Sequence, residues 1–256
     1  PRRSAFRQPV LEAQLRAGLQ RFPSVEMRFS TKVSRLTEQD DGVGVTLRAA
    51  DSSSEASARF VVACDGAKSG VREALGIAMS GSTYDQRWLI VDLAGSNDRF
   101  RHTKVYCDPA RPALALPGPG GARRYEMMML SSEEPDEMTQ ETRVRELLAR
   151  FSDEDAKLEI VRKAVYHFHA RIAERWAAGQ VFLAGDAAHL SPPFAGQGMN
   201  SGLRDANNLA WKLAAVIQRR LGPGLLASYQ QERRDHAGAM IEFALNMGRV
   251  LAPPNA

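Results

Sequence analysis

Apolar and polar residues alternate or form short runs in the first part of the chain, which predicts strands. The segment 25–67, "VEMRFSTKVSRLTEQDDGVGVTLRAADSSSEASARFVVACDGA", is divided by the turn residues 40–42 and by the serine-rich stretch 51–54. It ends in the apolar run 60–63, which predicts a buried strand. Before it, Pro9 can occupy a first helical turn, and apolar residues recur at helical spacing as far as Leu19. After it, "AKSGVREALGI" predicts a short helix.

The pattern changes from about Thr83 onward. "RWLIVDL" (87–93) and "HTKVYC" (102–107) predict strands, and "PALALPGPGGARRYEMMML" (112–130) predicts a hairpin with a Pro/Gly turn. Residues 135–151 predict one helix, with acids in its early part and arginines towards its end. "EIVRKAVYHFHARIA" (159–173) predicts another strand. This block is a candidate second domain.

The first pattern resumes at Gly179 with the strand "QVFLAGD". A long helix follows over 199–221, and the residues expected on its buried face are Leu203, Ala206, Ala210, Leu213 and Ile217. Gly222-Pro223-Gly224 should end it, and a last amphipathic helix is expected over about 225–251.

Composition narrows the function classes. The chain has 256 residues, 44% of them hydrophobic and 25% charged, typical of a globular protein with a substantial core. Its net charge of +4 comes from scattered or paired arginines without interleaved aromatics, which favours anionic small molecules over nucleic acid as partners. No apolar run approaches the ~20 residues of a membrane span. Cys64 and Cys107 are far apart, so we expect no disulfide framework and no metal site, and a reducing cytoplasm fits.

The stretch "VFLAGDAAHLSPPFAGQGMN" (181–200) carries the strongest chemical signal. Asp186 follows an apolar run, at the carboxyl end of a strand where open α/β sheets bind ligands, and Gly185 permits close backbone approach. A carboxylate in this position is suited to accept hydrogen bonds from sugar hydroxyls. An isolated Gly-Asp is more often an ordinary turn, but the loop and long helix attached to it favour a binding site.

The loop after Asp186 has prolines at its start and glycines at its end. Pro192 and Pro193 restrict its backbone, and Gly196 and Gly198 allow it to lie flat against a planar ligand. The helix that begins near Gly198 or Met199 presents free N–H groups and the positive end of its dipole. This arrangement stabilises a developing anion, such as the N1/C2=O edge of a reduced isoalloxazine.

A second strand ends in "FVVACDGAKSGVR". Asp65 and Gly66 follow the apolar run, and Ser69 can cap the helix that carries Arg72. Taken alone, Asp65-Gly66 indicates an ordinary turn. Two aspartates that each follow a predicted strand, Asp65 and Asp186, are a more informative signal for a binding site than either one.

The segments "CDGAKSGVR" and "VFLAGDAAHLSPPFAGQGMNSGLRDANNLAWKLAAV" resemble the DG and GD fingerprints of the single-component FAD-dependent aromatic hydroxylases, the p-hydroxybenzoate hydroxylase class. Within this class, "QRWLIVDL", "VYCDPARPALALPGPGGARRYEMMML" and "YHFHARIAERW" are most similar to the enzymes that act on 3-(3-hydroxyphenyl)propionate. The resemblance implies an α/β fold, with a split FAD/NAD(P)-binding, Rossmann-like domain at 1–82 and 177–256. An α+β substrate domain would be inserted at 83–176.

The resemblance also implies roles for individual residues. Asp186, with Gly185, would bind the ribose or ribityl hydroxyls of FAD, and the amides of Gly198, Met199 and Asn200 would lie near the pyrimidine edge of the flavin. The loop residues implied to face the flavin, with no side-chain acid or base assigned, are Pro193, Gly196 and Gln197. Further cofactor residues implied by the resemblance are Asp65, Gly66, Arg72 and Gln8, although Gln8 reads equally well as a polar residue ahead of a helix.

The implied reaction is hydroxylation of a phenolic acid such as 3-(3-hydroxyphenyl)propionate. NADH or NADPH would reduce FAD, and O2 would form a C4a-hydroperoxyflavin that transfers its distal oxygen to the ring. The partners are then a small phenolic substrate and O2, and a homodimer is one option that the sequence leaves open. Alternatives are a related hydroxylase of a polyketide or antibiotic, and a non-catalytic fragment of such an enzyme.

Several side chains in the chain are candidates for other roles. Tyr166, His167 and Phe168 could line the substrate pocket, or the histidine face could simply be solvated. A carboxylated substrate calls for an arginine anchor, for which the candidates are Arg101, Arg123, Arg124 and Arg171. His189, with Ser191 and Asp186, suggests a hydrolase, but no GxSxG elbow is present, and we expect His189 to brace its loop.

One feature of the family is missing. Its members open with a βαβ unit whose GxGxxG motif holds the pyrophosphate of FAD, and this chain contains no match in a strand-then-helix context. We therefore expect a fragment, or a chain that lacks its N-terminal βαβ unit, with weak FAD binding and no activity on its own.

Overall fold

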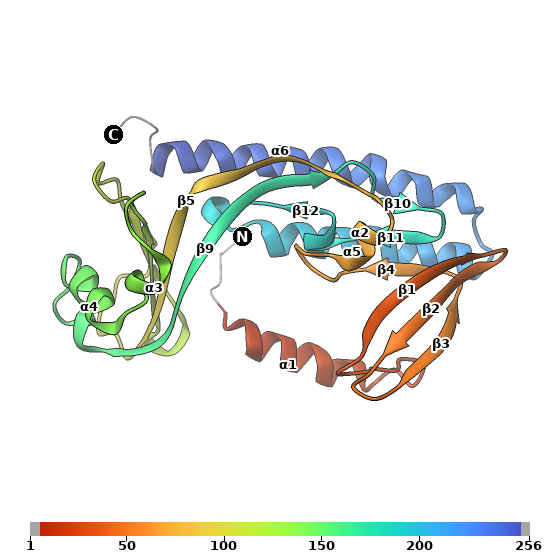
Figure 1. The fold of residues 1–256 in the computed structure, drawn as a ribbon, viewed down its shortest axis with the longest axis horizontal. Helices are drawn as coiled ribbons and strands as arrows, with labels where there is room; N and C mark the ends of the chain where they lie inside the picture. The colour runs from red at the N-terminus through yellow and green to blue at the C-terminus, as the bar shows by residue number, and fades with distance from the viewer. Residues whose placement is uncertain (1–5, 252–256) are drawn as a thin grey trace. The chain divides into compact units, whose positions relative to one another are not determined.

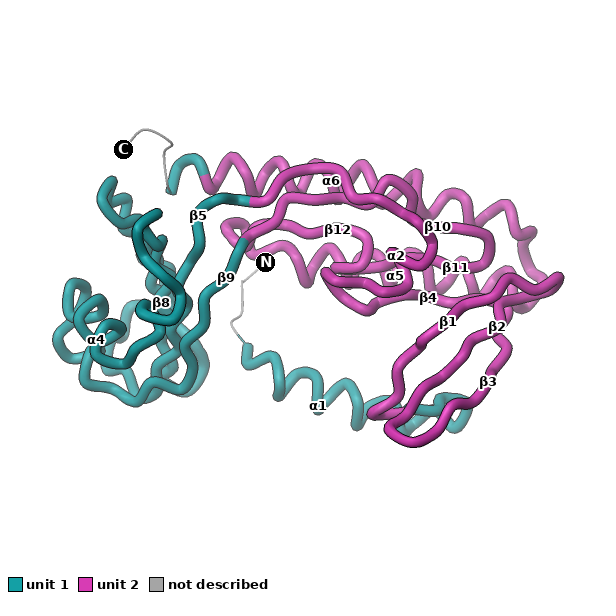
Figure 2. Tube along the Cα trace, viewed as in Figure 1, with its two compact units in different colours: residues 1–27, 84–167, 249–256 teal, residues 28–83, 168–248 magenta. Residues whose placement is uncertain are grey.

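The computed structural model describes residues 6–251 of the chain. It divides into two compact units, shown in different colours in Figure 2. Unit 1 comprises the described residues within 1–27, 84–167 and 249–256, and unit 2 comprises 28–83 and 168–248. No helix within the described part is both long enough and apolar enough to cross a membrane.

Most of the elements are labelled in Figure 1. The strands are β1 (Lys32–Gln39), β2 (Gly42–Arg48), β3 (Ser53–Ala58), β4 (Val61–Ala63), β5 (Met79–Ala94), β6 (Lys104–Tyr106), β7 (Ala113–Pro117), β8 (Arg123–Met128), β9 (Glu159–Ala173), β10 (Ala177–Ala178), β11 (Val181–Leu183) and β12 (His189–Leu190). The α-helices are α1 (Gln8–Leu19), α2 (Gly70–Ala74), α3 (Pro135–Met138), α4 (Glu141–Ala149), α5 (Gly198–Ile217) and α6 (Ala227–Leu251). These elements confirm most of the helices and strands that the sequence predicts.

Two small sheets belong to unit 2. In the first, β1, β2 and β3 form an antiparallel meander. In the second, β4 pairs in parallel with β11, and β10 pairs antiparallel with β11 on its other side. Because β4 and β11 are parallel and in register, with Ala63 opposite Leu183, the loops that follow them leave the sheet at the same edge. This edge positions the candidate site.

The third sheet has the order β12-β9-β5-β8-β7-β6. In unit 1, β5 pairs with β8 and β8 with β7, and the predicted hairpin is confirmed: its turn is a short 3-10 helix at Pro119–Gly121, where Gly120 has φ 67°. Residues buried on these strands pack with α4 to form the core of unit 1, which includes Leu89, Val91, Met127, Leu147 and Leu148.

The single helix predicted over 135–151 is wrong in one respect, because the structure has two helices there. Thr139 Oγ1 donates to the carbonyl of Pro135 at 3.0 Å, and Gln140 is extended, with ψ 138°, as the residue that precedes α4. A threonine hydroxyl bonded back to its own helix competes with continuation of that helix.

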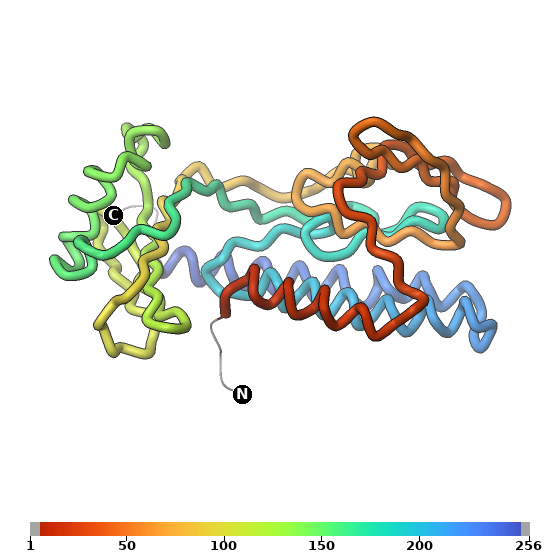
Figure 3. Tube along the Cα trace, turned by 90° about the horizontal axis from the view of Figure 1, so that it is seen from below, coloured from red at the N-terminus to blue at the C-terminus, as the bar shows by residue number. Residues whose placement is uncertain are grey.

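Helices α5 and α6 lie side by side within unit 2, as Figures 1 and 3 show. The predicted buried face of α5 is wrong: Leu203 and Ile217 are 56% and 48% exposed. The buried residues are instead Ser201, Asp205, Leu209, Lys212 and Val216. Two of these are charged, and α6 supplies partners to both. Lys212 Nζ, for instance, lies 2.7 Å from Ser228 Oγ and 2.9 Å from Glu232.

Candidate functional site

The loops after β4 and β11 lie together at the carboxyl edge of the parallel pair. The amide of Ala184 donates to the carbonyl of Ala63 at 3.0 Å, just before the two loops begin. Arg72, on α2, then joins them: its guanidinium donates to Ala67 in one loop at 3.0 Å and to Ala187 in the other at 3.1 Å. The loops that contain Asp65 and Asp186 therefore lie together at the same edge of the sheet.

Asp186 is the exposed carboxylate of this edge. It lies in a single 3-10 turn, Gly185–Ala187, which Gly185 enters with φ 60°. Within residues 6–251, no hydrogen bond or ion pair engages the Asp186 carboxylate. Both of its oxygens are thus available to accept hydrogen bonds from the hydroxyls of a ligand.

Asp65 and its neighbours are bound more firmly to the protein. Asp65 Oδ2 accepts the amide of Val71 at 3.1 Å, and Ser69 Oγ accepts the amide of Arg72 at 2.9 Å, which confirms Ser69 as the cap of α2. Gly66 has φ 84°, in the left-handed region that favours glycine. Arg72 is only 7% exposed, so its visible role is to hold the two loops together.

The loop from Pro192 to Gly198 follows Asp186 in the sequence, and its two glycines are unobstructed. A 3-10 turn at Pro193–Ala195 leads to Gly196 with φ 61°, and α5 begins at Gly198 as predicted. No atom lies within 4 Å of where a side chain would start on Gly196 or Gly198. Pro193 is exposed and Gln197 is half-buried.

The first amides of α5 are free donors. Those of Gly198, Met199 and Asn200 have no acceptor among the described residues, whereas the next amide, of Ser201, bonds to the carbonyl of Gln197 at 2.9 Å. Unpaired amides at the start of a 20-residue helix present partial positive charge to a ligand.

A buried network that the sequence did not reveal braces this site. Asp205 of α5 is fully buried and accepts the amide of Gly185 at 3.1 Å. It also accepts Arg233 Nε of α6 at 2.8 Å and lies 2.6 Å from His189 Nε2. His189 stacks on the ring of Trp176, with centroids 5.3 Å apart. The expectation that His189 braces its loop is confirmed.

Glycines on both sides let the loop and the helix approach closely. A side chain on Gly202 would start 3.4 Å from the Cα atom of Gly185, which is already van der Waals contact. Asp205 lies one turn further along α5 and holds Gly185 in place. No local spacing links Asp205 to Arg233, 28 positions later, so only the fold brings them together.

The other candidates lie elsewhere or are engaged. Phe168 is buried, and its ring meets that of Phe194 in the glycine loop edge to face, at 5.5 Å. Tyr166 and His167 are exposed residues of β9 in unit 1, where Arg162 donates to the hydroxyl of Tyr166. Gln8, also in unit 1, donates to Glu12 of its own helix at 2.8 Å.

Two of the four candidate arginine anchors are paired with acids. Arg123 is 2% exposed and lies 3.1 Å from the carboxylate of Asp98, and Arg124 donates to Asp92 at 2.6 Å. The side chains of Arg101 and Arg171 are exposed.

The donor set at the sheet edge fits the flavin end of FAD. A free carboxylate at Asp186 matches a polyhydroxylated chain, and three free amides at the start of α5 match a carbonyl edge that becomes negative on reduction. Gly196 and Gly198 carry no side chain that would keep a planar ring away from this backbone.

Comparison with known families gives one match over most of the chain. The family described as FAD binding domain matches residues 1–244.

Individual relatives agree with that match. The chain is 43% identical over 254 residues to a 3-(3-hydroxy-phenyl)propionate/3-hydroxycinnamic acid hydroxylase of Klebsiella pneumoniae (strain 342), a match that covers 99% of this chain and 46% of the relative. The structure resembles that of aklavinone-11 hydroxylase with FAD and aklavinone (TM-score 0.84, 31% identity, 96% of this chain and 47% of that one). It also resembles p-nitrophenol 4-monooxygenase of Pseudomonas putida DLL-E4 (TM-score 0.86, 25% identity, 95% of this chain and 63% of that one). The chain thus spans about half the length of the curated relatives it matches.

Proposed function

Because this chain belongs to the FAD-binding-domain family, we propose that it provides the flavin-contacting part of an FAD-dependent aromatic hydroxylase. The observation that carries the proposal is the free Asp186 carboxylate and the free amides of residues 198–200, which follow the same strand of the parallel sheet. The unobstructed backbone of Gly196, which lies between these groups in the sequence, also supports the proposal.

In this proposal each part of the edge has a distinct task. Asp186 accepts hydrogen bonds from the ribityl or ribose hydroxyls, and Gly185 lets the backbone approach them. The amides of Gly198, Met199 and Asn200 donate to the pyrimidine edge of the ring. The loop residues that face the ring are Pro193, Gly196 and Gln197.

The residues after β4 have a supporting part in the same proposal. Arg72 holds the two loops together, while Asp65 and Gly66 shape the turn that approaches FAD or the nicotinamide cofactor. Gln8 is proposed to reach the sugar chain of the flavin.

When bound, FAD would supply the redox chemistry of a hydroxylation in which NADH or NADPH provides two electrons, one atom of O2 enters the aromatic ring and the other leaves as water. The protein contributes the positioning of FAD and the electrostatic field around its ring. The start of α5 stabilises negative charge on the ring edge nearest to it, by about 0.3–2 kcal/mol from the helix dipole. Apolar residues such as Phe168 and Phe194 exclude water from their side of the loop.

The proposed substrate is a phenolic acid of the 3-(3-hydroxyphenyl)propionate type. The name of the 43% identical relative supports this substrate class over the polyketide class, which rests on a 31% identical structure. Tyr166, His167 and Phe168 are proposed to contribute to the substrate pocket.

The test of the proposed site is Asp186→Asn. Loss of a charge-assisted acceptor should weaken FAD binding about 10- to 100-fold, because hydrogen bonds to charged groups contribute about 1.5–3 kcal/mol. FAD affinity is measured by quenching of flavin fluorescence, on the longest gene product that contains this sequence. Asp51→Asn, at an exposed turn between β2 and β3, is the control and should bind FAD normally. Equal affinities for both variants would remove Asp186 from the site.

The 256-residue chain alone should bind FAD weakly or not at all. Its residues include no glycine-rich phosphate loop, which normally supplies the amides for the pyrophosphate. Gel filtration after incubation with FAD, followed by a visible spectrum of the protein peak, measures retention. A stoichiometric flavin spectrum would show that the pyrophosphate needs no such loop here.

A further inference from the structure

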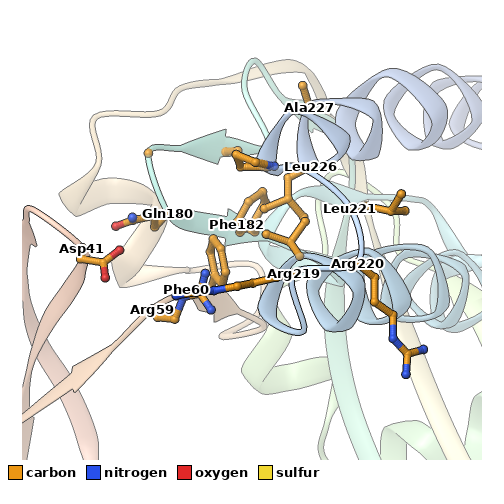
Figure 4. Close-up of a pocket in the computed structure, with 15 residues that line it drawn as sticks. Asp41, Arg59, Phe60, Gln180, Phe182, Arg219, Arg220, Leu221, Leu226 and Ala227 are labelled. Atoms are coloured by element: carbon orange, nitrogen blue, oxygen red, sulfur yellow. The ribbon is translucent and has the colours of Figure 1, made fainter.

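Unit 2 contains a cavity at the opposite edge of the parallel strands from the candidate flavin site. Its volume is about 800 Å³, a size that suits a small organic ligand. Phe60 and Gln180, which directly precede β4 and β11, contribute to its lining, as does the turn between α5 and α6 (Figure 4). The two sites also lie at opposite ends of α5, about 30 Å apart for a 20-residue helix.

The cavity combines an aromatic wall with cationic groups. The rings of Phe60 and Phe182 lie 6.2 Å apart at an interplanar angle of 56°. Arg59 lies over the ring of Phe60, 5.7 Å from its centroid, and donates to the carbonyl of Ile217 at the end of α5 at 3.3 Å. The single acid of the lining is Asp41.

Arg219 and Arg220 occupy the same turn but point in different directions. Figure 4 shows the side chain of Arg219 beside Phe60, whereas that of Arg220 extends away from the two rings. The described residues offer no hydrogen bond or ion pair to the Arg219 guanidinium. Arg219 is therefore the cation of this turn that can meet a ligand in the cavity.

The backbone of Arg219 is an independent reason to assign it a function. The turn is a Schellman motif: the amide of Arg219 bonds to Val216 at 3.0 Å, and that of Arg220 bonds to Ala215 at 2.9 Å. The left-handed position of this motif usually holds glycine, yet Arg219 occupies it with φ 55°. An arginine in place of glycine at this position is the observation from which a functional hypothesis for its side chain starts.

We propose that this cavity binds an organic anion with an aromatic body, whose ring packs against Phe60, which the buried Phe182 supports from behind, and whose carboxylate pairs with Arg219. Arg59 adds positive charge at the same rim. A carboxylate and a guanidinium form paired, charge-assisted hydrogen bonds, which explains the choice of arginine over lysine at this position. The site is independent of flavin binding.

The test uses 4-(trifluoromethyl)benzoate as the probe and fluorine NMR of the full chain as the readout. Binding to the wild type should broaden the fluorine signal of the probe, and the effect should saturate in a titration. Arg219→Gln should weaken binding about tenfold or more, since it removes one charged hydrogen-bond partner. The neighbouring Arg220→Gln is the matched control and should change affinity by no more than about twofold. The neutral analogue 4-(trifluoromethyl)benzyl alcohol should not distinguish the two variants.

Arg219→Gly separates a ligand-binding role from a structural one. Glycine suits the left-handed position, so this variant should keep or raise the melting temperature while it loses probe binding. A lower melting temperature would show that Arg219 merely caps α5. Undiminished binding to Arg219→Gln, or no saturable binding to the wild type, would also overturn the proposal.

Discussion

Asp205→Ala is expected to lower the free energy of unfolding by about 3–5 kcal/mol, the usual result of removing one partner from a buried ion pair. Arg233 is 6% exposed and would lose its only carboxylate partner among residues 6–251, and the amide of Gly185 and the ring of His189 would lose their acceptor. Urea denaturation of the wild type and the variant measures the difference.

The same substitution should also disturb the flavin loop. Asp205 fixes Gly185, the residue before Asp186, so its loss should weaken FAD binding even in the fraction that remains folded. Asp235→Asn, an exposed aspartate of α6, is the control and should cost less than about 0.5 kcal/mol. An Asp205→Ala protein as stable as this control would show that the network contributes no net stability.

Glu133→Gln is expected to destabilise unit 1 by about 3 kcal/mol, because it leaves Arg111 buried without its counter-charge. Arg111 is 4% exposed and holds both oxygens of Glu133, at 2.8 and 2.6 Å. Glu146→Gln is the control, since that exposed glutamate pairs only at the surface with Arg143. Equal melting temperatures for the two variants would contradict the prediction.

The same glutamate predicts the direction of acid sensitivity. Burial alone would raise the pKa of Glu133, but hydrogen bonds from Arg111, the amide of Leu130 and Arg143 lower it from about 4.5 to about 2. Its folded-state pKa is therefore below its unfolded-state value. The stabilisation is complete above about pH 4.5 and is lost as pH falls towards 2. Urea denaturation at several pH values between 6 and 3 measures this effect. The free energy of unfolding should fall less steeply with decreasing pH for Glu133→Gln than for the wild type.

The elements of the site were predictable from sequence because their signals are local. Ser69 precedes α2 by one residue, the glycines and prolines of the loop mark its turns, and α5 begins where the glycine pattern indicated. The two aspartates at strand ends were also recognised from sequence, but the parallel pairing of β4 and β11 that brings them to one edge is seen only in the structure.

The bracing of the site was not predictable, for a physical reason. Hydrophobicity assigned the face of α5 with Leu203 and Ile217 to the interior, yet the buried face contains Asp205 and Lys212. Charged residues become tolerable in a protein interior when partners are present, and those partners come from α6, distant in sequence. The cavity near Arg219 was missed similarly, because left-handed backbone at an arginine has no sequence signature.

The position of β4 at the end of its sheet leaves one of its sides open among the described residues. The amide of Val61 and the carbonyl of Ala63 bond towards β11, so the backbone of Val62 faces the other way, and its side chain is 39% exposed. Within residues 6–251 no further strand covers that side. Such an edge is a template for main-chain pairing, so a further strand can extend this sheet at β4.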